Sequence, residues 1–580
     1  MSRRHLALLA LVAGVLALLV AQAGSAAQSK PKPKKHPIHH KAKKPKPKPK
    51  PLTVAQRFAK IKHVVVIYEE NHSFDNLYGG WEGVNGRTGT PPANTTQLNQ
   101  AGTPFTCLLQ DDVNLTTPPQ DAACTDTTTG STFTSHFVNA PFVIDTYIAP
   151  TDTTCPPPLQ AFSFPNGVAK GAGLPGGCTR DIVHEFYQEQ YQLNGGQQNH
   201  YVTGSDAIGL TMGGYDTKAL PIYKYLHQPS HPKYVIEDNF FQSAFGGSFL
   251  NHQWLIAAAS PTYPGAPSNL HSIIDSNGMP VKYPLYNPTG PVLRGPLTVV
   301  CPSPVAGRAC GDYAVNTMQP SNPPSGAFGA KLPLQTAPTI GDRLTAKGID
   351  WAWYAGGWAN AAGETTSPGY TNGAGPNCTA PDTIPGSTYP ACPSNVFQFH
   401  HQPFNYFANY APGTPGRAHL QDEVAFTQLA SGSSASCKLK PVSFVKPFGS
   451  DNEHPGYASE PNGSNHLVSL LQSIEGSACA KDTMVVVAYD EFGGQWDHVP
   501  PPGQAGKAGP NDQFGPGTRI PALVIAPNLT RTFSVDHAQH DTTSILATIE
   551  HHWGVAALGT RDAAVKDLST VFAASAPSKK

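Results

Sequence analysis

The sequence predicts an α/β sandwich, in which a largely parallel sheet is covered by helices on both faces. Short apolar runs of strand length recur along the chain, and helical patterns separate them. Continuous apolar runs are typical of strands that are buried on both faces of a sheet. Strands that alternate with helices indicate an α/β architecture rather than segregated helices and strands.

The first 27 residues have the features of an export signal. Arg3 and Arg4 precede an apolar run over 6–20, and small residues at 24–27 offer a cleavage site. This start fits a twin-arginine signal as well as the general secretory route. An uncleaved membrane anchor is the alternative, although the run is short of the roughly 20 residues that a span needs. We expect a secreted or cell-envelope-associated protein.

Residues 28–51 alternate Lys and Pro, which predicts an extended, disordered spacer. Of the 39 Lys and Arg in the chain, 12 precede Pro51, whereas all 39 Asp and Glu follow it. The remainder therefore carries a formal charge of −12, which argues against nucleic acid as a partner. The spacer could contact anionic cell-wall polymer or lipid head groups, or it is simply a solvated linker.

Residues 52–575 are predicted to form one catalytic domain with long loop insertions, because 85–180, 260–345 and 356–395 are rich in Pro, Gly, Thr and Asn and lack periodicity. The oligomeric state is left open. Ten cysteines in an exported chain favour disulfides. We expect neighbours to pair across the loops: Cys107–Cys124, Cys155–Cys178, Cys301–Cys310, Cys378–Cys392 and Cys437–Cys479.

The elements of the sandwich follow from the local patterns. Five apolar runs predict strands: 61–68, 349–354, 442–445, 483–489 and 520–525. Three intervening patterns predict helices: 219–227, 465–475 and 542–553, the last with Asp541 as its N-cap.

Two of these strands end on acidic residues. The first runs into Glu69, Glu70 and Asn71, and the fourth into Asp490 and Glu491. Since ligands gather at the carboxyl ends of strands in α/β sheets, both clusters could meet at one edge. Either cluster alone could be a solvated turn or a helix cap. Two matched ends favour a metal site, and their oxygen atoms suit a hard divalent cation.

A third candidate is Ser248, which follows Gly246 and Gly247. Glycines allow the sharp turn that exposes a serine hydroxyl, so this serine could be a nucleophile. The triplet is weak evidence by itself, and it is not the Gly-x-Ser-x-Gly elbow of acyl hydrolases.

The run Val66-Ile67-Tyr68-Glu69-Glu70-Asn71-His72-Ser73-Phe74-Asp75 resembles the Glu-Asn-x-Ser-Phe-Asp signature of the bacterial phosphoesterase family. This family contains non-specific phospholipases C and acid phosphatases and lies in the alkaline-phosphatase superfamily. Similar stretches follow in collinear order over roughly 61–555: Asp181 to His184 with Asn194-Gly195-Gly196, Leu220 to Tyr223, Ser248 to Asn251, His400 to Phe404, Ser443 to Pro447 with Glu453 to Gly456, Asp490 to Pro502, and Arg519 to Pro527.

The resemblance implies an alkaline-phosphatase-like three-layer α/β/α sandwich with disulfide-tied insertions, and it implies a site. Glu70, Asn71, Asp490 and Glu491 would hold the metal, and Ser248 would be the nucleophile that also touches it. Asn251 would bind a phosphate oxygen. Four histidines would line the phosphate pocket, although any one His alone is usually structural: His184, His400, His401 and His454.

Other residues of these motifs are given supporting places. We expect Ser73 and Asp75 to cap a helix, Asp497 and His498 to lie behind the ligands, and His540 to be structural. Two departures, His72 in place of Arg and Phe249 to His252 in place of Pro-Asn-Arg, weigh against a specific phospholipase C assignment.

The predicted function is a secreted, metal-dependent phosphoric-ester hydrolase of acid-phosphatase or phospholipase-C type that works through a phosphoserine. The metal is left open among Ca, Mg, Mn, Zn and Fe. The substrate is a small phosphate ester or a phospholipid head group. A sulfatase is disfavoured, because the Cys/Ser-x-Pro-x-Arg motif is absent. The remaining alternative is a catalytically degenerate cell-wall- or lipid-binding protein on the same scaffold.

Overall fold

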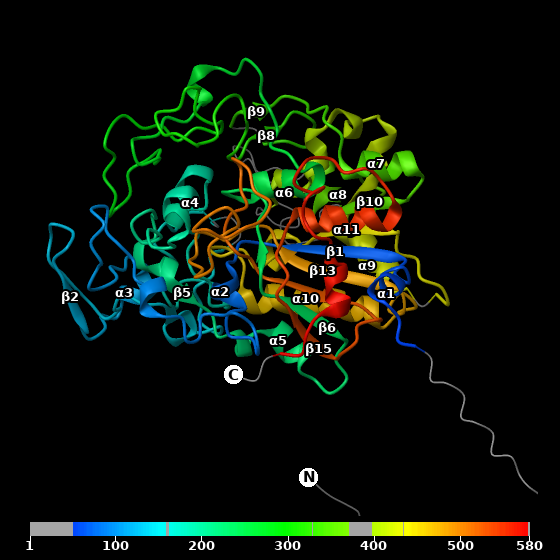
Figure 1. The fold of residues 1–580 in the computed structure, drawn as a ribbon, viewed down its shortest axis with the longest axis horizontal. Coiled ribbons are helices and arrows are strands. Elements are labelled where there is room, and N and C mark those ends of the chain that lie inside the picture. The colour runs from blue at the N-terminus through cyan, green and yellow to red at the C-terminus, as the bar shows by residue number, and fades with distance from the viewer. Residues whose placement is uncertain are drawn as a thin grey trace, which may run out of the picture. The chain divides into compact units, whose positions relative to one another are not determined.

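One mixed sheet of eight strands lies at the centre of the fold, in the order β11-β10-β12-β1-β13-β14-β6-β15 (Figure 1). The computed structural model describes residues 50–577 except 158, 159, 161, 327, 328, 371–396 and 433. The strands of the sheet are β1 (His63–Glu69), β6 (Tyr234–Glu237), β10 (Trp351–Ala355), β11 (Leu420–Asp422), β12 (Val442–Lys446), β13 (Thr483–Tyr489), β14 (Ala522–Ile525) and β15 (Phe533–Asp536).

Five of these strands confirm the sequence prediction: β1, β10, β12, β13 and β14. Three were missed, because β6, β11 and β15 have only three or four residues and show no periodicity at that length. The sheet is parallel except at β14, which runs antiparallel to both β13 and β6. An apolar run indicates burial on both faces but not the direction of the strand, so the reversal could not be read from the sequence.

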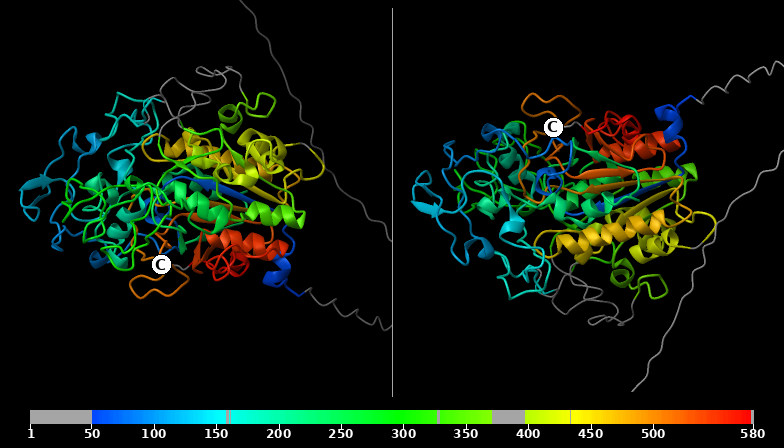
Figure 2. Two further views of the ribbon diagram at one scale, coloured as in Figure 1. Left: turned by 90° about the horizontal axis from the view of Figure 1, so that it is seen from above. Right: turned by 90° about the horizontal axis from the view of Figure 1, so that it is seen from below.

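Helices cover both faces of the sheet. The set α5 (Pro221–Leu226), α9 (Glu423–Ala430) and α10 (Glu460–Glu475) packs together, and α6 (Ser248–Ala257) contacts α7 (Ile340–Lys347) and α11 (Thr543–Trp553). Figure 2 shows α10 and α11 on opposite faces of the sheet. The predicted three-layer sandwich is therefore confirmed.

The three predicted helices are present but begin at other residues: α5 at Pro221, α10 at Glu460 and α11 at Thr543. Helix α11 begins at Thr543 rather than directly after Asp541, although Asp541 Oδ1 still accepts the Thr543 N–H at 2.7 Å. Helix α7 lies partly in a segment predicted as loop. Its signal was a capping box, in which the side chains of Thr339 and Asp342 each accept the other residue's backbone N–H.

The remaining elements are short. The helices are α1 (Val54–Phe58), α2 (Phe74–Leu77), α3 (Val113–Thr116), α4 (Phe186–Leu193) and α8 (Trp358–Ala362). Four two-stranded pairs are β2 (Cys124–Asp126) with β3 (Phe133–Ser135), β4 (Phe142–Val143) with β5 (Gly213–Gly214), β7 (Phe240–Phe241) with β16 (His540–Asp541), and β8 (Gln319–Pro320) with β9 (Lys331–Leu332). The long insertions gather at the end of the sheet where β1 leads into α2 (Figure 1).

Disulfides join the loops as expected. Cys107–Cys124, Cys155–Cys178, Cys301–Cys310 and Cys437–Cys479 are bonded, whereas Cys378 and Cys392 lie outside the described residues. The chain divides into residues 1–51 and a compact unit of residues 52–580. The predicted signal and nearly all of the spacer also lie outside the described part. Within that part, no helix has the length and apolar character to cross a membrane.

Candidate functional site

The parallel pair β1 and β13 brings the two acidic strand ends together. Glu69 is in register with Tyr489, so the residues that follow each strand leave the sheet side by side. Asp490 Oδ1 accepts the Asn71 backbone N–H at 3.0 Å. Asn71 has a left-handed φ of 59°, which turns the chain immediately after the strand. The expectation that both clusters meet at one edge is borne out by this geometry.

Ser248, the first residue of α6, lies against these acids. Its Oγ is 3.2 Å from Glu70 Oε2, 3.1 Å from Asn71 Oδ1 and 3.5 Å from Glu491 Oε1. A single hydroxyl proton satisfies only one of three acceptor oxygens. Asp490 Oδ2 is also buried without a hydrogen-bond donor. Buried, converging oxygens of this kind are the donor set of a hard divalent cation, so the residues present fit the metal that the sequence predicts.

Lys446, at the end of β12, is a site residue that the sequence reasoning missed. Its fully buried Nζ lies 2.5 Å from Glu70 Oε1 and donates to the carbonyl oxygen of Tyr68 at 2.9 Å. Burial alone would raise the pKa of Glu70, but Lys446, together with His401 and His454, outweighs it and holds that pKa well below its usual value. The sequence offered one signal for Lys446: it is a lysine at the end of an apolar strand, and that strand lies beside β1.

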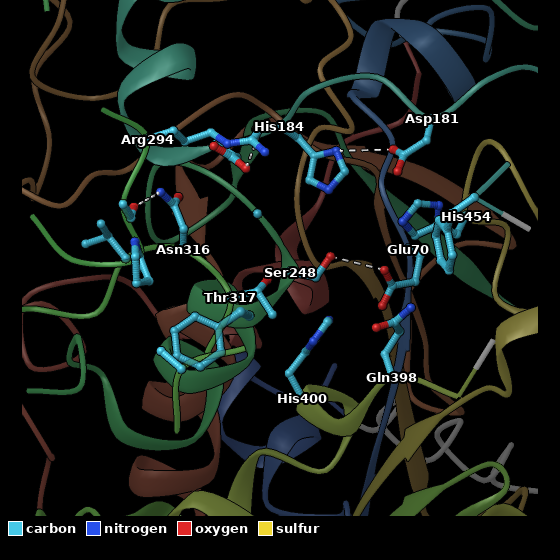
Figure 3. A pocket seen from close by; sticks show the side chains of 18 of the residues that line it. Glu70, Asp181, His184, Ser248, Arg294, Asn316, Thr317, Gln398, His400 and His454 are labelled. Atoms are coloured by element: carbon cyan, nitrogen blue, oxygen red, sulfur yellow. Dashed lines mark hydrogen bonds and ion pairs between the residues drawn. The ribbon is translucent and has the colours of Figure 1, made fainter. Parts of the chain in front are cut away.

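Three of the four predicted histidines line a cavity of about 520 Å³ above Ser248: His184, His400 and His454 (Figure 3). His401 does not line this cavity. Its Nε2 lies 2.8 Å from Glu70 Oε1, on the same side as Lys446. Burial lowers the pKa of His401 to about 4, so the imidazole is neutral beside Glu70.

His454 and His184 differ in charge. His454 Nδ1 donates to the Pro455 carbonyl at 2.6 Å, which leaves Nε2 to accept the Asn71 side-chain amide at 2.9 Å. This contact orients the Asn71 amide with its oxygen toward Ser248. Burial would lower the pKa of His184, but the charges of Glu491 and Asp181 raise it to about 10. For His400, burial holds the pKa well below its usual value.

The side chain of Asn251 faces the main chain of the turn before Ser248. The side chain is fully buried and does not belong to the cavity lining. Its Oδ1 accepts the Ala244 N–H at 3.0 Å, and its Nδ2 lies 3.1 Å from the carbonyl oxygens of Ala244 and Gly246 and 3.3 Å from that of Gly247. In this structure these contacts hold the turn that precedes Ser248. The contact of Asn251 with a phosphate oxygen stays a prediction.

His252 was also missed, although it is four residues after Ser248 on the same helix. Its Nδ1 donates to the Ser248 carbonyl at 2.8 Å, and its ring stacks on His401 with centroids 5.3 Å apart. Burial holds the pKa of His252 well below its usual value. A neutral imidazole therefore supports the first turn of α6 from beneath.

Two motif residues given supporting places, Ser73 and Asp75, are buried at the start of α2. Ser73 caps α2 as expected, since its hydroxyl accepts the Asn76 N–H at 3.2 Å. Asp75 is not a cap: its carboxylate pairs with Arg519 at 3.0 Å and with His498 Nδ1 at 2.5 Å. His72 Nε2 lies 3.0 Å from Glu460 Oε1.

The outer wall of the cavity comes from the insertion over residues 260–345. Arg294 Nη1 lies 3.5 Å from Glu185 Oε1. Asn316 fastens this wall to the start of α4, because its amide donates to the Gly295 carbonyl at 2.9 Å and its oxygen accepts the Phe186 N–H at 3.2 Å. Figure 3 shows Arg294 and Asn316 on the side of the cavity opposite Glu70.

The chain resembles proteins of known activity over most of its length. Residues 61–556 match the profile of the Phosphoesterase family. Phospholipase C A of Mycobacterium tuberculosis is 22% identical over 545 residues, which cover 88% of this chain and 77% of that protein. Phospholipase C B of the same organism is 32% identical over 160 residues, and this match spans 24% of this chain and only 30% of that protein. A solved 2-O GAG sulfatase is 12% identical over 64% of this chain and 72% of its own, with a TM-score of 0.27, which is too low to compare the folds.

Proposed function

Because the chain belongs to the phosphoesterase family, we propose that it hydrolyses phosphoric esters with the Ser248 hydroxyl as nucleophile. One observation carries the proposal: Ser248 Oγ lies 3.1–3.5 Å from oxygens of Glu70, Asn71 and Glu491. Ser248 and Glu70 line a cavity whose wall also contains the imidazoles of His184, His400 and His454.

Glu70, Asn71, Asp490 and Glu491, together with Ser248, would hold one divalent cation. When bound, the cation lowers the pKa of the serine hydroxyl and offsets the charge of the phosphoryl group. Lys446 keeps Glu70 ionised, and His454 keeps the amide oxygen of Asn71 directed at the same point.

The proposed reaction has two displacements at phosphorus. Ser248 Oγ bonds to phosphorus while the bond to the leaving alcohol breaks, and the hydroxyl proton passes to the carboxylates around it. Of the cavity imidazoles, His184 is the one whose raised pKa keeps it protonated, so it holds a phosphoryl oxygen and protonates the departing alkoxide. Water then attacks the phosphoserine and the Oγ–P bond breaks. Ser248 takes back its proton from the carboxylates, and one proton of the attacking water returns to His184.

The proposed substrate is a phosphate ester, either a small molecule or a phospholipid. Two relatives carry the name phospholipase C, and the leaving group would face the wall that contains Arg294. A degenerate binding protein on this scaffold would not need an ionised Glu70 beside the Ser248 hydroxyl. We also propose that the chain is exported, and its disulfides support this; contact of the spacer with an anionic cell wall stays a prediction.

The test compares Ser248→Ala with Ser243→Ala on an aryl phosphate. Ser243 is buried five residues earlier and lies 3.5 Å from Asp541 rather than on the cavity. We expect about a 10³-fold loss or more in kcat for Ser248→Ala and little change for the control. Acid quenching during turnover should trap phosphate on the peptide that contains Ser248. Turnover of the Ser248 variant at the wild-type rate would exclude the proposal.

Metal dependence is tested separately. Chelator treatment should abolish activity, divalent ions should restore it, and elemental analysis identifies the ion. If activity survives exhaustive chelation and no divalent ion is left in the protein, the reaction at Ser248 does not require the proposed cation.

A further inference from the structure

Three side chains able to bind a metal meet at the edge of the sheet that β15 forms, outside the Ser248 site. Glu237 and Asp536 end the parallel strands β6 and β15 in register with each other, and His540 begins β16. One atom from each of these side chains lies within 4.8 Å of the others. His540 Nε2 is 3.8 Å from Glu237 Oε2.

The two carboxylates are buried without compensation. Glu237 is 0% exposed and Asp536 is 7% exposed. Neither oxygen of Glu237 receives a hydrogen bond, and Asp536 Oδ2 receives none either. Asp536 Oδ1 accepts only the Ala538 N–H, at 2.9 Å. Within the described chain, no Lys or Arg forms an ion pair with either carboxylate. Buried carboxylates of this kind require a cation or a proton.

His540 is oriented as a metal-binding imidazole would be. Its Nδ1 lies 3.2 Å from the Lys566 carbonyl oxygen and donates its proton there. The Nε2 lone pair therefore faces Glu237 and the hydroxyl of Thr570, which is 3.0 Å away. Histidines that bind metals commonly donate their other ring N–H to a carbonyl or a carboxylate, which sets the tautomer.

A proton would be the simpler occupant, and burial does raise the pKa of Glu237 well above its usual value. One proton on Glu237 can serve only one neighbouring oxygen, whereas three buried carboxylate oxygens have no hydrogen-bond partner: Glu237 Oε1, Glu237 Oε2 and Asp536 Oδ2. A divalent cation satisfies all of these atoms together and removes the net negative charge.

We propose that Glu237, Asp536 and His540, with the Thr570 hydroxyl as a weaker fourth donor, bind a second divalent cation. One imidazole and two carboxylates fit Zn²⁺ or Mn²⁺ better than Ca²⁺ or Mg²⁺, which prefer oxygen alone. His540 also lines a cavity of about 310 Å³, on the side where Lys566 lies.

The second ion has a structural role. It joins the ends of β6 and β15 to β16 and to η13 (Leu568–Ala573), which contains Thr570. Strand β16 pairs with β7, and β7 leads into the turn that carries Ser248. None of the residues of this site belongs to the Ser248 site, so its occupancy is independent of the proposed catalysis.

The experiment counts tightly bound zinc in the full-length protein after loading with Zn²⁺ and removal of loosely bound ion by a weak chelator. We expect two equivalents in the wild type. Glu237→Gln and His540→Ala should each lose one equivalent and keep the Ser248-site ion, and Glu70→Gln should lose the other. The matched control is Glu550→Gln, which neutralises another buried glutamate, on α11. This variant should keep both equivalents of zinc.

Thermal unfolding gives a second measurement. Zn²⁺ should raise the Tm of the Glu70→Gln protein through the second site alone, and the double variant Glu70→Gln/Glu237→Gln should lose that rise. Equal counts in Glu237→Gln and Glu550→Gln would overturn the second site, whatever the Ser248 site holds. This outcome is readable even if His540→Ala does not fold, because it depends only on the two Glu→Gln variants.

Discussion

Replacing Asn251 with alanine tests whether this side chain holds the nucleophile turn or binds phosphate. Its amide faces the main chain of Ala244, Gly246 and Gly247, just before Ser248. Two amide protons and one carbonyl oxygen can make three of these hydrogen bonds at once. At about 1 kcal/mol net for each bond, Asn251→Ala should lose about 3 kcal/mol of unfolding free energy.

The turn would also relax around Ser248. Because misplacement of a reacting group by about 1 Å can cost 10²-fold in rate, we expect kcat on an aryl phosphate to fall by about 10²-fold. The inhibition constant of inorganic phosphate should stay within about 3-fold of wild type if Asn251 does not contact phosphate. A tenfold change in this constant would require a loss of about 1.4 kcal/mol in the binding free energy of phosphate. Urea unfolding followed by circular dichroism, steady-state kinetics and phosphate inhibition give the three readouts.

Asn405→Ala is the matched control, because Asn405 is also fully buried and also holds a loop. It donates to the carbonyls of Asn322 and Pro324 at 3.1 and 3.0 Å and accepts from Arg417 at 2.6 Å. It should lose a similar unfolding free energy and keep its kcat. An Asn251→Ala protein with unchanged urea stability and phosphate inhibition weakened tenfold or more would refute the positioning role and support the phosphate contact.

Three further predictions concern stability. Lys446→Met leaves the buried carboxylate of Glu70 without its ammonium partner, so the unfolding free energy of the metal-free variant should fall by about 3–5 kcal/mol relative to wild type. Metal loading should recover much of this loss, and equal losses with and without metal would contradict the prediction. Opening the Cys437–Cys479 disulfide, which closes a separation of 42 residues, should lower the unfolding free energy by about 4 kcal/mol through loop entropy. Urea unfolding of the double alanine variant against the oxidised wild type measures this. Burial raises the pKa of Asp112 to about 6, so the contribution of this group to stability is full below about pH 4 and is lost as the pH rises through 6. The unfolding free energy of wild type relative to Asp112→Asn should therefore fall by about 3 kcal/mol from pH 4 to pH 7, and a pH-independent difference would contradict the raised pKa.

The amino-acid sequence determined the sandwich and the floor of the site. Apolar runs longer than four residues marked β1 and β13, and such runs require burial on both faces wherever they lie. Acidic residues at the ends of both runs are unfavourable in a sheet unless something binds them there. The convergence of Glu70 and Asp490 was therefore predictable from local pattern, and the neighbouring pairs of cysteines followed from their spacing in the same way.

Only the tertiary structure decided which side chains face the cavity and which support it from behind. Asn251 and His401 stand in motifs with the residues that line the cavity, but a motif does not record side-chain direction. Asn251 turns to its own loop because the main chain of residues 244–247 offers it hydrogen-bonding partners. Lys446 reaches Glu70 because β12 lies beside β1, although 376 positions separate the two in the numbering. Contacts of that kind depend on strand order and direction, which an apolar run leaves undetermined because it looks the same in either direction.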